Sequence, residues 1–225
     1  MNLTGMVLKA TPVGENDRRL VILTRERGKI TAFARGAKRP GSPLLGVTRP
    51  FVFGTFKLYE GRDAYNLQAA DVLNYFSGIT MDMEATCYGS YFLEFADYYS
   101  RENLEATEQL LLLYQSLRAL LKSALPNSLV QAVFELRSMA INGDYTEHPP
   151  RPVSDSANYA WEYIVASPLE SLYTFTLAPE VLEELKHCVE LNKRRFIDRE
   201  FHSLEILKMM ETAVRGTQQS AVQGK

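Results

Sequence analysis

The sequence has few of the residues that build disulfides, metal sites or membrane spans. Its 225 residues include only two cysteines, Cys87 and Cys188, and three histidines. The cysteines lie far apart and form no C-x-x-C pair, so neither a disulfide framework nor a paired-cysteine metal site is predicted. The longest apolar run, 110–114, is far shorter than the roughly 20 residues that a membrane-spanning helix needs. The first residues lack the features of a signal peptide, and we expect a cytoplasmic protein.

The sequence also lacks the residue patterns that catalysis requires. His148, His187 and His202 form no H-x-x-x-H or H-E-x-x-H pattern. His187 adjoins Cys188, but neighbouring residues on a helix point in different directions and make a poor catalytic dyad. No glycine-rich phosphate loop follows a predicted strand. We therefore predict no catalytic residue, no cofactor and no small-molecule substrate.

Negative charge is missing from one stretch of the first third of the chain. The net charge of the whole chain, −2, conceals this uneven distribution. Residues 1–80 contain 12 Lys and Arg against 6 Asp and Glu, whereas residues 81–225 contain 13 against 21. No acidic residue occurs from Thr31 to Tyr59. Lys and Arg neutralise phosphates and release counterions, so a basic stretch favours sequence-tolerant binding of nucleic acid. An ordinary solubilising loop is the alternative interpretation.

Alternating apolar and polar residues predict a small β-barrel in the first third of the chain. Five strands are expected, at 4–13, 18–25, 30–35, 51–60 and 65–73. The loop at 36–43 holds two Pro and two Gly, which excludes a regular element there. Five short strands of this length fit an OB-type barrel. The pattern alone leaves an SH3-like barrel open.

Aromatic residues on the fourth predicted strand are candidates for stacking on bases. Alternation places Phe51, Phe53 and Tyr59 on one face of that strand and Phe56 on the other. Exposed aromatic side chains stack on the bases of single-stranded nucleic acid, whereas buried ones belong to the core. The pattern does not decide which of the two faces is exposed.

The apolar period changes to that of helices beyond residue 80. Helices are predicted at 83–99, 107–124, 128–141, 159–166 and 204–213, and another is predicted to begin at Pro179. An extended segment is predicted at 172–177. The predicted fold class is therefore α+β, with several domains. A five-stranded OB-fold barrel would occupy 1–78, a helical domain 79–215, and a disordered tail 216–225.

Several short runs follow one another in a fixed order along the first part of the chain. They are GMVLK (5–9), GEND (14–17), LTRERGKI (23–30) and ARGAKRP (34–40). This order resembles the start of the RecO family of recombination mediators. The resemblance continues more loosely in YFLE (91–94), FEL (134–136) and FHSLEIL (201–207).

The resemblance implies a fold, an activity and partners. It implies an OB-fold followed by a helical domain, and a role in DNA repair and homologous recombination near the bacterial nucleoid. It implies binding of single- and double-stranded DNA, annealing of complementary strands, and recombinase loading with RecR and single-stranded-DNA-binding protein. The DNA-contact candidates that it suggests are Arg35, Lys38 and Arg39 of the loop, and further Lys9, Arg18, Arg19, Arg27, Lys29, Arg49 and Lys57. Arg25 and Glu26 are expected to be structural partners instead.

The chain departs from the family pattern at one position. Many RecO proteins carry a four-cysteine zinc module after the third helix, but the matching stretch here, 143–158, contains no cysteine. Because tetrahedral zinc needs four ligands, we expect a shortened loop there and no metal. Two other functions stay open from the sequence: a protein-interaction scaffold that binds no nucleic acid, and an OB module that binds RNA or oligosaccharide.

Overall fold

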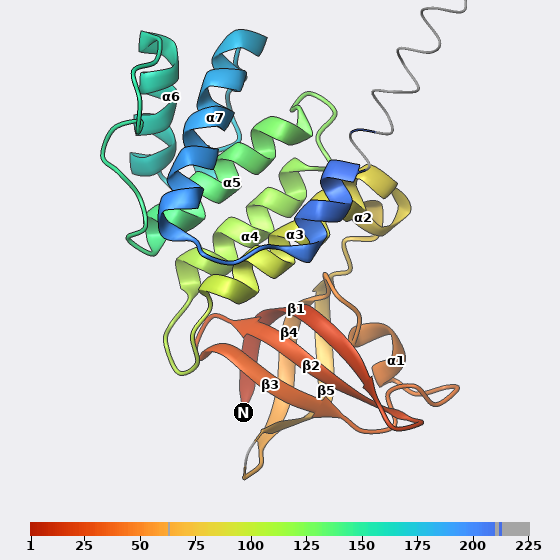
Figure 1. Ribbon diagram of the computed structural model, residues 1–225. Helices are drawn as coiled ribbons and strands as arrows, with labels where there is room; N and C mark the ends of the chain where they lie inside the picture. Colours follow the sequence, from red (N-terminus) through yellow and green to blue (C-terminus); the bar gives the residue numbers. More distant parts are fainter. Residues whose placement is uncertain (63, 210–211, 213–225) are drawn as a thin grey trace, which may run out of the picture.

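A computed structural model describes residues 1–62, 64–209 and 212, and shows a β-barrel joined to a helical half (Figure 1). The barrel contains β1 (Asn2–Val13), β2 (Asp17–Thr24), β3 (Gly28–Ala34), β4 (Phe53–Glu60) and β5 (Tyr65–Asn74). The strands close in the order β1-β2-β3-β5-β4, because the long β1 pairs with both β2 and β4. The prediction of a five-stranded OB-type barrel followed by helices is confirmed.

Alternation along the strands determines what fills the barrel. Leu20 and Ile22 of β2 point inward and are fully buried, as are Ala32 of β3 and Phe56 of β4. The short helix α1 (Leu44–Val47) contributes its two buried apolar residues to the same core. Residues of the opposite parity on β1, β2 and β3 therefore form the outer face of the sheet.

Six further helices and one 3-10 turn have both ends within the described residues of the helical half. They are α2 (Ser77–Met81), α3 (Met83–Tyr99), α4 (Thr107–Ala119), α5 (Asn127–Ile141), α6 (Asp155–Ala166), η1 (Leu169–Ser171) and α7 (Pro179–Phe196). Residues 202–209 are also helical. The structure describes only part of the helix predicted at 204–213, and the tail predicted at 216–225 lies outside the described residues.

Three predicted boundaries in the helical half are wrong. The helix predicted at 107–124 ends at Ala119. The helix predicted at 159–166 begins at Asp155, because the Ser154 side chain accepts a hydrogen bond from the Ala157 backbone and caps the helix. The predicted loop at 143–158 is shortened accordingly. The segment predicted to be extended, 172–177, follows η1 as a turn and a stretch without regular structure.

One apolar core joins the barrel to the helices. Met6, Leu8 and Leu23 point outward from β1 and β2 and belong to the same buried cluster as Phe92 of α3. The register of β1 against β2 shifts between Val7 and Lys9, so that Lys9 as well as Leu8 lies on the outer face. The helices therefore cover one end of the outer face of β1–β2–β3 and leave the other end exposed. Whether the two halves are separate domains divided near residue 78 stays a prediction.

The loop between α3 and α4 is hydrogen-bonded to the turn between β2 and β3. Its Arg101 carbonyl accepts a hydrogen bond from the Lys29 backbone, and its Asn103 backbone donates to the Arg27 carbonyl, both at 2.9 Å. Gly28 lies inside this contact with φ +62°, and a Cβ there would lie 2.2 Å from the Arg101 oxygen. Only glycine fits this position, since both the backbone conformation and the space exclude a side chain.

A buried ion pair ties α5 to α7. Lys193 Nζ lies 2.9 Å from Glu135 Oε1 and 2.9 Å from Glu190 Oε2. Tyr91 of α3 also donates a hydrogen bond to Glu135. Burial alone would lower the pKa of Lys193, but the carboxylates of Glu135 and Glu190 raise the pKa above its ordinary value. Burial would raise the pKa of Glu190, but Lys193 holds it below its usual range.

Candidate nucleic-acid interface

Three cationic side chains cross the exposed end of the β1–β2–β3 face in a diagonal line. Lys9 of β1 and Arg19 of β2 are exposed, and exposed Arg35 follows the last residue of β3. In the strand register Lys9 lies opposite Val21, and Arg19 lies opposite Phe33. Lys9 and Arg19 are therefore diagonal cross-strand neighbours, as are Arg19 and Arg35, a relation that spans about 7–8 Å. We name these three side chains the cation diagonal.

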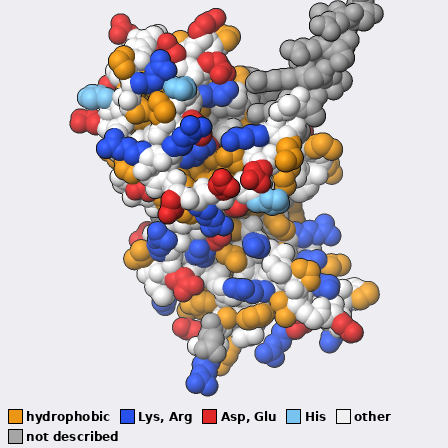
Figure 2. All heavy atoms as spheres, in the orientation of Figure 1, with side chains coloured by type: hydrophobic (Ala, Val, Ile, Leu, Met, Phe, Trp, Pro, Cys, Tyr) orange, Lys and Arg blue, Asp and Glu red, His pale blue; other side chains and the backbone are white. Residues whose placement is uncertain are grey.

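The cation diagonal is not engaged in direct ion pairs within the described chain, although the Asp17 carboxylate, which accepts a hydrogen bond from the Gly36 backbone, lies close to Arg35. None of its members forms an ion pair with any residue that the structure describes. Figure 2 shows Lys and Arg side chains spread over the front of the barrel below the helices, with fewer Asp and Glu among them. The positive potential of this face is therefore available to an anionic ligand.

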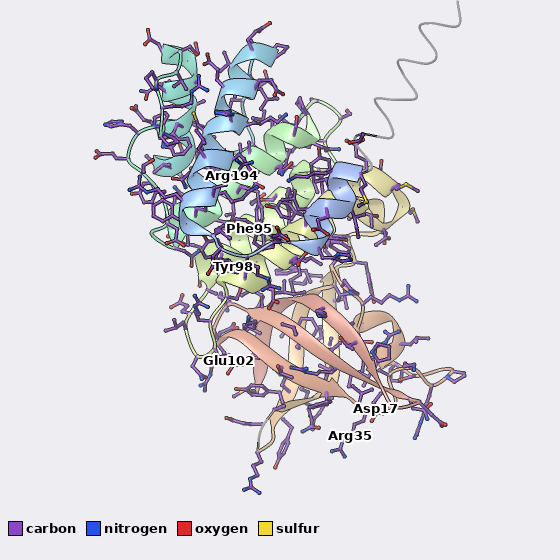
Figure 3. The ribbon with its side chains drawn as sticks, viewed as in Figure 1. Asp17, Arg35, Phe95, Tyr98, Glu102 and Arg194 are labelled. Atoms are coloured by element: carbon purple, nitrogen blue, oxygen red, sulfur yellow. The ribbon has the colours of Figure 1, made fainter. Side chains whose placement is uncertain are left out.

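The predicted loop cations lie next to the cation diagonal because the loop is tied back to the barrel. The Gly36 backbone donates to Asp17 Oδ1 at 2.7 Å, and the Lys38 backbone donates to the Asn16 carbonyl at 2.9 Å. Figure 3 shows Asp17 and Arg35 together at one end of the barrel. Lys38 is half-buried and Arg39 is exposed. The structure thus brings the three predicted loop cations to one end of the outer face.

Two of the other predicted contacts have structural partners. Arg18 Nη1 donates to Thr48 Oγ1 at 2.8 Å and to the Leu45 carbonyl at 3.2 Å, which holds α1 against the barrel. Lys29 Nζ lies 3.0 Å from Asp97 Oδ1 and donates to the Asp97 carbonyl, which joins β3 to α3. Their charged groups are therefore engaged within the protein.

The remaining predicted contacts are exposed but lie elsewhere on the barrel. Arg27 lies in the β2–β3 turn beside the α3–α4 loop, and Arg49 lies in the turn after α1. Lys57 lies on β4, where it is opposite Asn2 of β1 and Ala69 of β5. The structure does not bring these three side chains to the cation diagonal. The expected structural pair is present, since Arg25 Nη2 lies 2.9 Å from Glu26 Oε1.

Most of the predicted aromatic candidates are part of the core. Phe51 and Phe56 are buried, and Phe53 packs against Tyr114 of α4 with ring centroids 4.7 Å apart. Phe51 precedes β4 and has φ 71°, so the strand parity predicted for it is wrong. Tyr59 is 64% exposed, but it lies on β4 rather than on the face with the cation diagonal.

Phe33 is a stacking candidate that was not predicted from the sequence. Phe33 is half-buried on the outer face of β3, directly opposite Arg19 of the cation diagonal. The signal was present in the sequence, because alternation places Phe33 with Thr31 and Arg35, opposite the buried Ile30 and Ala32. An aromatic ring between cationic side chains suits both the base and the phosphate of one nucleotide.

The described part of the chain has neither a cluster of metal-ligating side chains nor a membrane-spanning helix. In residues 1–62, 64–209 and 212, no group of three or more His, Cys, Asp and Glu side chains could hold a metal ion. In place of a zinc module, the loop before α6 is held by Trp161 Nε1, which donates to the Thr146 carbonyl at 3.1 Å. No helix among these residues is long and apolar enough to cross a membrane.

Comparison with known proteins identifies the family. The models "Recombination protein O N terminal" and "Recombination protein O C terminal" match residues 1–76 and 80–147. The DNA repair protein RecO of Acetivibrio thermocellus is 25% identical over 94% of this chain and 97% of its own length. RecO proteins of Desulforudis audaxviator and Bacillus subtilis are 38% and 30% identical, over 61% and 64% of this chain and 55% and 56% of their own lengths. The barrel, the helices that follow it and these matches agree, and the chain belongs to the RecO family of DNA repair and recombination proteins.

Proposed function

We propose that this protein is a recombination mediator that binds DNA on the exposed end of the β1–β2–β3 face. It would anneal complementary strands and help to load a recombinase together with RecR and single-stranded-DNA-binding protein. The observation that carries the proposal is the cation diagonal, in which Lys9, Arg19 and Arg35 lie unpaired beside Phe33 on one face.

The geometry suits a single strand that crosses the three β-strands. Successive cations on neighbouring strands meet successive phosphates of one backbone, and each contact releases a condensed counterion. Arg19 and Arg35 present planar guanidinium groups, which bind phosphate oxygens through paired hydrogen bonds. Phe33 lies opposite Arg19, where its ring provides a surface for one unstacked base.

Annealing follows from holding two polyanions close together without forming or breaking a bond. The loop that carries Lys38 and Arg39 extends the positive surface beyond the cation diagonal. Two strands bound side by side on this surface would repel each other less than in solution, because Lys and Arg neutralise part of their charge. Pairing of complementary bases then fixes the register.

The helical half favours the same placement of the DNA. Residues 81–225 carry 13 Lys and Arg against 21 Asp and Glu, so their net charge repels phosphate. The helices also cover the apolar end of the outer face, where Met6 and Leu8 are buried. A bound strand is therefore confined to the exposed, cationic end of the barrel.

A salt titration of oligonucleotide binding tests the proposal. The variant Lys9→Gln/Arg19→Gln/Arg35→Gln removes the cation diagonal, and the control Arg27→Gln/Arg49→Gln/Lys57→Gln removes the same charge elsewhere on the barrel. The slope of log affinity against log salt should fall by about 2 in the first variant, since a single strand gives about 0.7 per phosphate contact. In the control, the slope should change by less than half of that amount.

Two results would overturn the proposal. Equal losses of slope in both variants would mean that binding depends on the total charge of the barrel rather than on the cation diagonal. Wild-type protein without any salt-dependent binding would favour the protein-interaction scaffold. Matched circular dichroism spectra of the two variants exclude unfolding as the cause of a loss.

A further inference from the structure

An aromatic hollow lies at α6, a helix that Figure 1 shows on the side of the helical half remote from the barrel. Its volume is about 510 Å³, and it is lined by residues of α6 and by the segment that leads into α7. The rings of Tyr159, Tyr163 and Phe175 form its walls, and Asp155 lies in its lining. This size is sufficient for a large side chain of a binding partner.

The rings are held in place around the hollow and do not fill it. Tyr163 donates a hydrogen bond from its hydroxyl to the Ser171 carbonyl at 3.1 Å. The ring of Phe175 meets the ring of Tyr163 edge to face, with centroids 5.3 Å apart. Tyr159 lies 6.2 Å from Tyr163 between ring centroids and is 69% exposed. Such exposure of a large aromatic side chain leaves a ring face free for a ligand.

The segment that forms the hollow carries charge of one sign in its sequence. Residues 152–185 contain no Lys, Arg or His, while they contain six carboxylates: Asp155, Glu162, Glu170, Glu180, Glu183 and Glu184. This is the reverse of residues 31–59, which contain no carboxylate. Glu162 and Glu183 pair with His148 and Lys186, whereas Asp155, the carboxylate in the lining, forms no ion pair with a described residue. The chain thus combines an anionic region with exposed aromatic ring faces, and both attract cations.

We propose that the hollow binds a cationic side chain, Arg or Lys, from a basic segment of a partner protein. The cation would lie against the faces of Tyr159, Tyr163 and Phe175, with the Asp155 carboxylate as its counter-ion. Charge repulsion by the Asp155 carboxylate in the lining disfavours nucleic acid as the ligand. The proposal is independent of DNA binding on the barrel, because the two surfaces lie on different halves of the molecule (Figure 1).

A ligand titration of the full-length protein tests the charge requirement. The probes are N-acetyl-arginine amide and its neutral isostere N-acetyl-citrulline amide, and the readout is the NMR spectrum of protein labelled in its Tyr and Phe rings. The arginine probe should give saturable shifts of the rings of Tyr159, Tyr163 and Phe175. The citrulline probe should bind at least about five-fold more weakly, because a neutral group gains little from the ring faces.

Variants at the exposed ring test the position of the site. Tyr159→Ala should weaken binding of the arginine probe about five-fold, whereas Tyr159→Phe should retain it, since the interaction needs the ring rather than the hydroxyl. The control Tyr75→Ala removes another exposed tyrosine, 50% exposed and outside the hollow, and should bind as the wild type does.

Several outcomes would overturn the proposal. In the titration, they are equal shifts with both probes, no shift of the three rings, or tighter binding of N-acetyl-leucine amide than of the arginine probe. Among the variants, it is a loss of affinity in Tyr159→Phe as large as that in Tyr159→Ala. The assay contains no DNA, so its failure would leave the proposed function of the barrel unaffected.

Discussion

Replacing Lys193 by Met should destabilise the helical half severely. Lys193 and Glu135 are only 8% and 4% exposed, and their charged groups lie 2.9 Å apart. Without the ammonium group, the Glu135 carboxylate keeps only the hydrogen bonds from Tyr91 and Gln131. Removing one partner of a buried ion pair leaves an uncompensated charge, which costs about 3–5 kcal/mol.

The size of this effect can be measured by urea denaturation with linear extrapolation. The matched control is Lys186→Met, which removes an ion pair of similar length, 2.7 Å, with Glu183, whose side chain is 69% exposed. Exposed pairs contribute about 0–1 kcal/mol, so this control should be close to the wild type. A double variant, Glu135→Met/Lys193→Met, should recover most of the stability, because apolar side chains replace buried ion pairs with little cost.

The same cluster determines how stability depends on pH. The pKa of Glu190 is lowered in the folded protein, so its contribution is present above about pH 4.3, its unfolded value, and is lost as the pH falls. The pKa of Lys193 is raised, so its contribution is present below about pH 10.4 and is lost as the pH rises through the folded pKa. If Lys193→Met cost no more than Lys186→Met, or left the alkaline limit of stability unchanged, the buried pair would not hold α5 to α7.

Two further substitutions probe how the barrel is held. Gly28→Ala should lower the free energy of unfolding by more than about 2 kcal/mol, because of the positive φ and the clash with the Arg101 carbonyl. In denaturant melts this loss should exceed that of Gly14→Ala, since Gly14 has φ +56° but no neighbour within 4 Å. Equal losses would refute the clash. Arg18→Gln should loosen α1, because the hydrogen bonds from Arg18 to Thr48 and Leu45 are lost. The backbone amides of residues 44–47 should then exchange faster with solvent. Unchanged exchange would show that apolar packing alone holds α1 against the barrel.

Local alternation in the sequence was sufficient to predict the barrel strands and the outward direction of Arg19. The parity of β2 and β3 separates inward Leu20 and Ile22 from outward Arg19, and it also places Phe33 outward. Side-chain direction in a strand follows from the backbone alone, so a reader of the sequence can recover it. The loop cations next to Arg35 were predicted on other grounds, namely the resemblance to the RecO family and the lack of acidic residues at 31–59.

The features that sequence reasoning missed depend on contacts between distant segments. The irregular register near Leu8 and the positive φ of Phe51 interrupt the parity of their segments, and both residues pack against the helices. Lys29, a predicted DNA contact, pairs with Asp97, 68 residues further along the chain. Such pairings are properties of the folded chain, and no local pattern encodes them.

Photo-cross-linking to a single-stranded oligonucleotide that contains 5-iododeoxyuridine tests the assignment of the DNA-binding face most directly. Trypsin cleaves after Lys29 and Arg35, so Phe33 falls in the peptide 30–35, while Tyr59 falls in the peptide 58–62. Because Phe33 lies beside the cation diagonal, the cross-link should map to Phe33 and should disappear in Phe33→Ala. A cross-link confined to Tyr59, on β4, would place the DNA on a different face of the barrel and contradict the assignment.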